Sequence, residues 1–281
     1  MIRPINSIDI DIGTQKASWT DYLRAYSRNL ADLPKPQLIV GAGSQTHSTI
    51  LTAGRMTGAP TVVLMSPPFG LRHLFDLCIV PEHDRVRGRN IITTQGALNR
   101  VQVSSEKLRH SGLILIGGPS KHHGWDDAQI ADQIQILLQQ NHGKKWTLTT
   151  SRRTPPHTHQ LLSEIASEQL DFVPVEQTDG PWLPTQLAAA RFVWVTEDSV
   201  SMVYEALSSG AKVGLLPVPR KKQSSRVVRG IDQLTERGQV LPFRPDACDL
   251  SAFNAPETIN ESGRMAQVVE HTFLKTIHPL P

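Results

Sequence analysis

Short, continuous apolar segments alternate with helix-like segments along almost the whole chain, and this alternation constrains the fold more than any other feature. The segments 36–43, 59–67 and 75–84 are rich in Val, Ile and Leu and lack in–out alternation. Strands of this kind are typical of a parallel sheet with helices on both faces. The sequence therefore predicts an α/β protein of the doubly wound, Rossmann-like class.

The alternation restarts in the second part of the chain. A new apolar strand with a Gly-Gly turn, 112–120, follows a join near 96–112, and further β–α units come after it. Two such sets without a repeated sequence predict two domains. We place an N-terminal domain at 1–100 and a C-terminal domain at 101–260. A terminal amphipathic helix and tail, 261–281, can pack back on the first domain.

Composition excludes several classes of protein. The 281 residues include 29 Lys and Arg and 26 Asp and Glu, which gives a formal net charge of +3. So small a charge argues against a dedicated nucleic-acid-binding protein. Two cysteines make no disulfide framework. No apolar run approaches the ~18 residues of a transmembrane helix. The start of the chain has acids where a signal peptide needs an apolar core. We therefore expect a cytoplasmic protein, with peripheral membrane contact left open.

Ligands of doubly wound sheets bind at the carboxyl ends of the strands, where helices begin. The first such turn contains Gly41, Gly43 and Ser44, with Thr46 where a dinucleotide-binding fingerprint would have its third glycine. The pattern favours a tight turn over a NAD site.

Two further turns suit an anionic ligand. The turn at 117–125 offers Gly117 and Gly118 for close backbone approach, with the Ser120 hydroxyl and the Lys121 ammonium. The turn at 149–156 carries Ser151, Arg152 and Arg153, whose guanidinium groups match a diphosphate or a carboxylate. A solvated surface turn is an equal alternative for each of them.

The fourth turn lies within "VTEDSVSMVYEALSSGAKVGLLPVP", Val195 to Pro219. Asp198 or Ser199 suits a helix N-cap, and Gly210 suits the left-handed residue that ends the helix. Glu205 falls at the border of the buried stripe of this helix. It is an exposed helical glutamate on the pattern alone, or a carboxylate that accepts hydrogen bonds from the vicinal hydroxyls of a ribose.

Metal and hydrolase motifs are missing from the sequence. There is no His-Glu-x-x-His, no Cys-x-x-Cys and no Gly-x-Ser-x-Gly, and His157 and His159 have no supporting ligands. The adjacent His122 and His123 are expected to be exposed to solvent. We expect no metal ion and no cofactor.

Taken together, these segments resemble the mitochondrial fission ELM1-like family, whose bacterial members look like glycosyltransferases of the GT-B architecture. The resemblance covers about 36–243 and rests on the stretches "PQLIVGAGSQT", "FDLCIVPEHDRVRGRNIITTQGALNRV", "LILIGGPSKHHGW", "LTTSRRTP" and "VTEDSVSMVYEALSSGAKV".

The resemblance implies two Rossmann-like domains that face each other across a cleft, the second of which binds a nucleoside diphosphate sugar without a metal. By position, the implied donor-binding residues are Gly117, Gly118, Ser120, Lys121, Ser151, Arg152, Arg153, Ser199, Ser201, Met202 and Glu205. The residues implied on the acceptor side are Gly41, Gly43, Ser44 and Glu82. His83 and Asp84 are the candidates for a general base, with a structural turn as the alternative.

The chain departs from the family pattern at its start. Family members begin with a strand and a loop of the "DG-x-x-G-H" type, which "MIRPINSIDIDIGTQKASW" does not contain, so we expect the first domain without that strand and loop. Because this loop helps to form the acceptor side, two alternatives to a glycosyltransferase stay open. One is a non-catalytic scaffold that recruits a partner, as in plant mitochondrial division, where a eukaryotic relative acts at the mitochondrial surface. The other is a sugar-nucleotide epimerase. The acceptor stays unknown, and a bacterial envelope glycan would suit the class.

Overall fold

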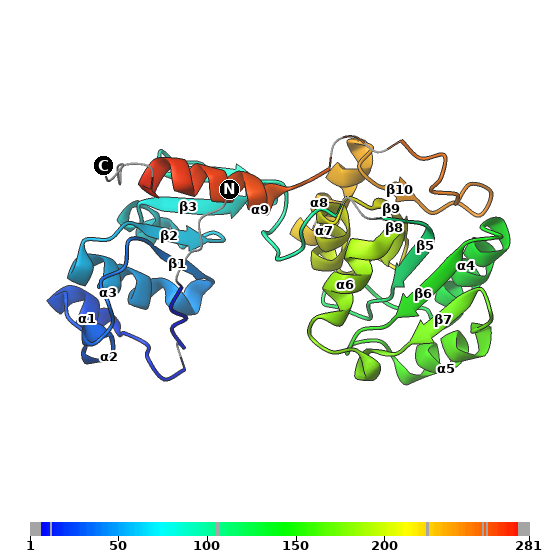
Figure 1. The fold of residues 1–281 in the computed structure, drawn as a ribbon, viewed down its shortest axis with the longest axis horizontal. Coiled ribbons are helices and arrows are strands. Elements are labelled where there is room, and N and C mark those ends of the chain that lie inside the picture. The colour runs from blue at the N-terminus through cyan, green and yellow to red at the C-terminus, as the bar shows by residue number, and fades with distance from the viewer. Residues whose placement is uncertain are drawn as a thin grey trace. The chain divides into compact units, whose positions relative to one another are not determined.

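The chain folds into two compact units, each with a sheet of its own (Figure 1). The computed structural model describes residues 7–11, 13–104, 107–222, 225–254, 256 and 258–274. Unit 1 comprises Met1–Leu98 and Gly263–Pro281, and unit 2 comprises Asn99–Ser262. Each sheet is entirely parallel, as expected for two α/β domains.

Unit 1 has a four-stranded sheet in the order β1-β2-β3-β4. The strands are β1 (Ile39–Ala42), β2 (Thr61–Leu64), β3 (Leu77–Pro81) and β4 (Ile91–Thr94). The helices are α1 (Trp19–Arg24), α2 (Arg28–Ala31), α3 (His47–Thr57) and α9 (Glu261–Val269), which continues as a π-helical segment, Glu270–Leu274. Short 3-10 turns cover η1 (Ser44–Thr46), η2 (Phe69–Leu74) and η3 (Glu82–Asp84).

Both faces of the unit 1 sheet are covered, which explains its continuous apolar strands. Val63 of β2 points to the face covered by α3, where Ile50 and Leu51 are buried. The neighbouring Val62 points to the opposite face and packs with Met265 of α9. The terminal helix thus packs on the first sheet, along the strands in Figure 1.

Unit 2 has a six-stranded sheet in the order β10-β9-β8-β5-β6-β7. The strands are β5 (Leu108–Leu115), β6 (Lys145–Thr149), β7 (Leu170–Val173), β8 (Ala190–Thr196), β9 (Lys212–Leu216) and β10 (Leu241–Pro242). Counted from β5, this is the 3-2-1-4-5-6 order of the dinucleotide-binding Rossmann fold.

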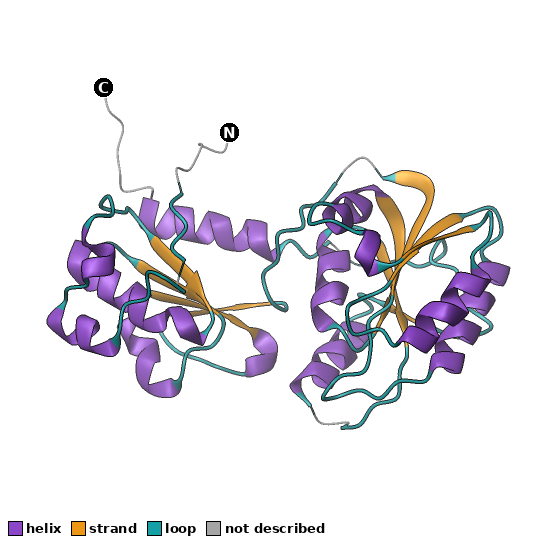
Figure 2. Cartoon of the chain, turned by 90° about the horizontal axis from the view of Figure 1, so that it is seen from below, coloured by secondary structure: helices purple, strands orange, loops and turns teal. Residues whose placement is uncertain are grey.

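Helices flank both faces of the unit 2 sheet (Figure 2). Those of this unit are α4 (Asp127–Gln140), α5 (Pro156–Ile165), α6 (Trp182–Ala189), α7 (Val200–Ser208) and α8 (Arg226–Glu236), with a 3-10 turn η4 (Val175–Gln177). One core lies under α6, α7 and α8 and the other under α4 and α5.

Candidate functional site

The strand order of unit 2 reverses at β5, which lies between β6 and β8. From β5 the chain proceeds to β6 and β7 on one side, and then crosses to β8 on the other. Connections leave such a point in opposite directions, and the crevice outside the carboxyl ends of these strands is where doubly wound sheets bind ligands. The turns after β5, β6 and β8 therefore define the candidate site.

The turn after β5 is held by side chains from the two neighbouring turns. The backbone N–H of Gly117 donates to Thr196 Oγ1 at 2.8 Å, and that of Gly118 donates to Asp198 Oδ2 at 3.1 Å. On the other side, the Thr154 hydroxyl donates to the Gly117 carbonyl at 2.5 Å. These bonds join the ends of β6, β5 and β8 into one edge.

The two glycines are required by the packing of the protein on itself. A Cβ at Gly117 would lie 2.3 Å from Asp198 Oδ2. A Cβ at Gly118 would lie 2.2 Å from the backbone carbonyl oxygen of Arg153. The sequence interpretation, in which these glycines make room for a ligand, is not needed to explain them.

The two adjacent arginines have different roles in the structure. Arg153 Nη2 lies 2.9 Å from Asp198 Oδ2, and Arg153 Nη1 donates to the Gly118 carbonyl at 2.7 Å. Asp198 is fully buried, and its other oxygen, Oδ1, has no hydrogen-bond partner among the described residues. Arg152 is exposed and forms no ion pair in the described part of the chain. Arg153 is thus committed to the loop, whereas Arg152 is available to an anion.

Beside this pair lies a second ionic group, in which Glu197 is buried and Arg220 and Asp232 are partly exposed. Arg220 Nη2 lies 2.5 Å from Glu197 Oε2, and Arg220 Nη1 lies 2.8 Å from Asp232 Oδ1. His123 is completely buried nearby, and burial lowers the pKa of its imidazole. The expectation that His123 is exposed is therefore wrong, because the 120–123 turn folds back and pairs His123 with Arg220 in an isolated β-bridge.

Helix α7 begins without a side-chain cap. Ser199 is its N-cap residue, but the Ser199 side chain makes no capping hydrogen bond. Asp198, the other predicted cap, bonds to Gly118 and Arg153 instead. The first N–H groups of a helix have no intrahelical acceptor and carry its positive dipole end. Because neither Ser199 nor Asp198 caps α7, the N–H groups at its start can interact with an anion.

Glu205 is the unusual residue of α7. Its neighbours Val203, Ala206 and Leu207 are buried in the core, as the stripe pattern predicts, and Met202 packs partly buried beside them. Glu205 is half-buried, and burial raises the pKa of its carboxyl. Within the described ranges, no hydrogen bond or ion pair involves the Glu205 side chain. The Glu205 backbone lies about 7.5 Å along the axis from the first residue of the helix.

The remaining donor-side residues lie in the same three turns. Lys121 is exposed after β5, and Ser201 is exposed in the first turn of α7. The Ser120 hydroxyl accepts the N–H groups of His122 and His123, and the Ser151 hydroxyl accepts the N–H of Arg153. Two of the predicted serines thus shape their own turns.

The predicted acceptor-side residues all belong to unit 1. Gly41, Gly43 and Ser44 follow or end β1, and Glu82, His83 and Asp84 form η3 directly after β3. Both groups lie at the carboxyl edge of this sheet, with β2 between their strands. The Ser66 hydroxyl donates to Asp84 Oδ2 at 2.5 Å, so the Asp84 carboxylate is tied to the end of β2.

Sequence reasoning missed several residues that build the unit 2 edge, namely Thr154, Thr196, Glu197 and Arg220. For Thr196 and Glu197 a signal exists, because both directly follow a continuous apolar strand. Polar residues at such a position face the carboxyl edge of the sheet.

The comparison with protein families decides the affiliation of the chain. The family model for mitochondrial fission ELM1 matches residues 5–273. The chain belongs to the mitochondrial fission ELM1 family. Among curated proteins, the uncharacterized protein RP120 of Rickettsia prowazekii (strain Madrid E) is 25% identical over 206 residues, which are 67% of this chain. The match spans 57% of the length of that relative.

Solved structures of low sequence identity are similar to this ELM1-family chain. A Listeria monocytogenes protein assigned as a UDP-N-acetylglucosamine 2-epimerase has a TM-score of 0.51 at 11% identity, covering 84% of this chain and 74% of that one. MurG of Acinetobacter baumannii has a TM-score of 0.45 at 13% identity, covering 98% of this chain and 77% of that one. The fold is GT-B-like, with two Rossmann-like units.

The described residues contain no group of three or more His, Cys, Asp or Glu side chains that could hold a metal ion. Among the described helices, none is long and apolar enough to cross a membrane.

Proposed function

We propose that unit 2 binds a nucleoside diphosphate sugar and that the protein transfers the sugar to an acceptor without a metal ion. The observation that carries the proposal is the start of α7, which is uncapped and has an unpaired, half-buried carboxylate five residues further on. A structural helix gains nothing from either feature, since a desolvated carboxylate without a partner lowers stability.

The two features suit the two ends of a nucleoside diphosphate. A ribose diol can donate two hydrogen bonds to the Glu205 carboxylate, and the diphosphate prefers the positive end of the helix about a turn away. Lys121 and Arg152 supply exposed cationic groups at the neighbouring turns. In this proposal Arg153 holds the loop and does not bind the ligand.

The groups that this reaction requires follow from the negative charge that develops on the leaving diphosphate. Breaking the bond between the sugar and the diphosphate places negative charge on the departing oxygen. The helix N-terminus and cationic side chains can stabilise that charge without a metal ion. A base must also take the proton of the acceptor hydroxyl, and His83 or Asp84 of unit 1 would serve. The identity of the acceptor is not part of this proposal. A bacterial envelope glycan, present in the cytoplasm or at a membrane surface, would suit this reaction.

One observation favours a second candidate, a non-catalytic module that recruits a partner. Asp198 and the Arg153 backbone approach the paired glycines closely, so the protein itself fills part of the switch point. An epimerase would use the same nucleotide-sugar site, and the Listeria protein of similar fold is assigned that activity. The two activities differ in their need for an acceptor, since a transferase requires one and an epimerase does not.

A ligand screen tests the proposal. The full chain is heated with UDP, GDP, ADP, TDP and their sugars, and a ligand at 100 times its Kd stabilises the folded state by about 2.7 kcal/mol. We expect one nucleoside diphosphate and the corresponding nucleoside diphosphate sugar to raise Tm. When an acceptor is added, the sugar should pass to the acceptor and the nucleoside diphosphate should be released. If no nucleotide changes Tm, the recruitment module replaces the transferase.

A further inference from the structure

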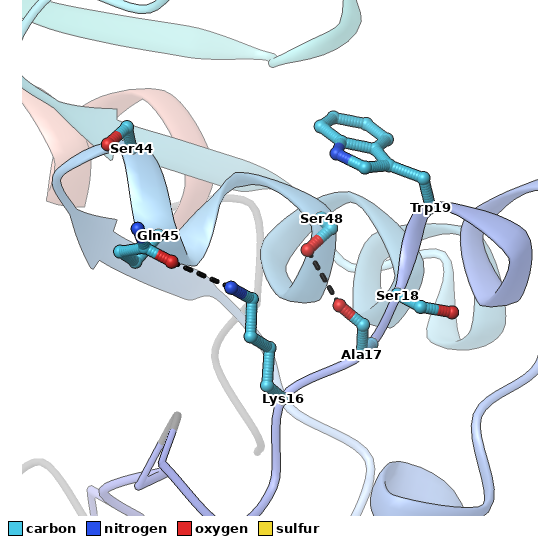
Figure 3. A pocket seen from close by; sticks show the side chains of 7 residues that line it. All are labelled: Lys16, Ala17, Ser18, Trp19, Ser44, Gln45 and Ser48. Atoms are coloured by element: carbon cyan, nitrogen blue, oxygen red, sulfur yellow. Dashed lines mark hydrogen bonds between the residues drawn. The ribbon is translucent and has the colours of Figure 1, made fainter.

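A cavity of about 410 Å³ lies in unit 1, beside the turn that follows β1 (Figure 3). Its lining residues are Lys16, Ala17, Ser18, Trp19, Ser44, Gln45 and Ser48. The volume falls within the range of about 300–1,000 Å³ that is typical of small-molecule sites. The cavity belongs to unit 1 alone and shares only Ser44 with the residues discussed above.

One wall of this cavity, the segment that contains Ala17, is hydrogen-bonded to helix α3 through both the N–H and the carbonyl of Ala17. The N–H of Ala17 donates to Thr49 Oγ1 at 3.1 Å, and the Ser48 hydroxyl donates to the Ala17 carbonyl at 2.6 Å. Ala17 itself is fully buried. Lys16 and Trp19 therefore extend from an anchored segment, which makes the cavity a preformed feature.

The cavity carries an uncompensated positive charge. Lys16 Nζ donates to Gln45 Oε1 at 2.7 Å, and this partner is neutral (Figure 3). None of the lining residues is acidic, and in the described part of the chain Lys16 forms no ion pair. An ammonium has three N–H donors, so two remain for a ligand. Ser44, the first residue of η1, is exposed and also lines the cavity.

Trp19 gives the cavity a flat apolar face. Trp19 is 45% exposed, so its ring can be reached by a ligand. Its ring is placed by an edge contact with Tyr22, at 5.9 Å and 87°, and the Arg55 guanidinium lies over the Tyr22 ring at 4.9 Å. A sugar ring has C–H groups on its faces and hydroxyls at its edge, so its face fits an exposed indole and its edge fits the Ser44 hydroxyl, since Ser18 and Ser48 already bond to Asp21 and to the Ala17 carbonyl.

We propose that this cavity binds a sugar that carries an acidic group, either a phosphate or a carboxylate. The sugar ring lies on Trp19, and the acidic group lies at Lys16 and Ser44. Such a ligand is the acceptor of the transfer reaction, a role that rests on the proposed function. The binding itself does not rest on it.

Calorimetric titration of the full chain tests the binding. Glucose 6-phosphate, glucuronate, glucose and inorganic phosphate are the four probes. We expect the two acidic sugars to bind at least tenfold more tightly than glucose, and more tightly than phosphate alone. Lys16→Met removes the preference for the acidic sugars, and Trp19→Leu weakens the binding of every sugar. The control variants Lys35→Met and Tyr26→Ala change exposed side chains of unit 1 outside the cavity and leave binding unchanged.

Each outcome decides the proposal. It is overturned if glucose binds as tightly as the acidic sugars, if none of the probes binds, or if Lys16→Met binds all four as the wild type does. Should Trp19→Leu fail to fold, Lys16→Met decides alone, because the Lys16 side chain is exposed. Titration of the same variants with the nucleotide found in the screen separates the two proposals. Lys16→Met leaves nucleotide binding intact, and Arg152→Ala leaves acidic-sugar binding intact.

Discussion

Each unit has two glycines where a parallel strand ends, Gly41 within β1 and Gly43 after it in unit 1, and Gly117 and Gly118 after β5 in unit 2. Around Gly43 the space that a Cβ would occupy is open, and the residue has a φ of +82°. Around Gly118 the same space is filled by the backbone of Arg153. The first glycine supplies a backbone conformation that disfavours other residues, whereas the second allows close packing. One sequence signature thus has two physical causes, and the unit 1 turn borders the cavity lined by Lys16 and Trp19.

Replacing the packed glycine has the largest expected effect. Gly118→Ala places a methyl group against a backbone carbonyl that cannot move away, so we expect a loss of about 3 kcal/mol or more in the free energy of unfolding. Gly43→Ala meets only backbone strain of about 1–3 kcal/mol. Gly180→Ala, where a Cβ meets nothing within 4 Å, is the control. Urea unfolding measures all three, and equal losses for Gly118→Ala and Gly43→Ala would remove the distinction.

The two adjacent arginines give the next effect. Arg153→Met leaves the buried Asp198 carboxylate without its cation. Breaking a buried pair costs about 3–5 kcal/mol, and we expect about 2 because Arg153 is 43% exposed. Arg152→Met changes stability by no more than about 0.5 kcal/mol. Thermal unfolding of the two variants checks this asymmetry, which fails if both lose the same stability.

Ligand binding should show the opposite asymmetry. Arg152→Ala removes a charged hydrogen bond to the diphosphate, so the Kd of the nucleotide should rise roughly 10- to 100-fold. Salt should weaken the wild type more than the variant, because the variant has lost one charge contact. Lys35→Ala is the matched control on unit 1. An Arg152→Ala protein that binds nucleotide as the wild type does would return Arg152 to the solvated surface.

The smallest effect concerns the stability contributed by Glu205. Burial raises the pKa of this carboxyl above 4.5 in the folded state, so folding favours the protonated form. Stability is therefore greatest below the unfolded pKa and falls as pH rises through the folded pKa. Glu205→Gln lacks this fall, and should be more stable than the wild type at pH 7 by less than about 1 kcal/mol. At pH 4 the difference should shrink. A Gln variant that is less stable at pH 7 would show that the carboxylate has a partner.

Much of the fold could be predicted from the sequence, because a parallel sheet covered on both faces needs continuous apolar strands. Val62 and Val63 are adjacent and both buried, on opposite faces. Helix α8 was not predicted, although its sequence carries a signal: its buried residues, Val228, Ile231 and Leu234, recur every third position among polar ones, which is typical of an amphipathic helix.

The edge of the sheet at which the site lies could also be predicted, since the carboxyl ends of parallel strands meet there. The roles of individual side chains could not. Arg152 and Arg153 are chemically identical neighbours, and only the position of Asp198 distinguishes them. Likewise, Asp198 has the sequence position of a helix cap, but its carboxylate bonds to the neighbouring turn.

The affinity of the Glu205→Gln variant for the nucleotide found in the screen tests the central claim most directly. The substitution keeps the shape of the side chain and removes the charge that strengthens its hydrogen bonds to a ribose diol. By calorimetry at pH 7, we predict a loss of about 1–2 kcal/mol in binding, roughly 5- to 30-fold in Kd. The corresponding deoxynucleotides, which lack one of the two hydroxyls, should lose less on this substitution than the ribonucleotide does. An unchanged Kd for the ribonucleotide would contradict the account and leave α7 as a structural helix.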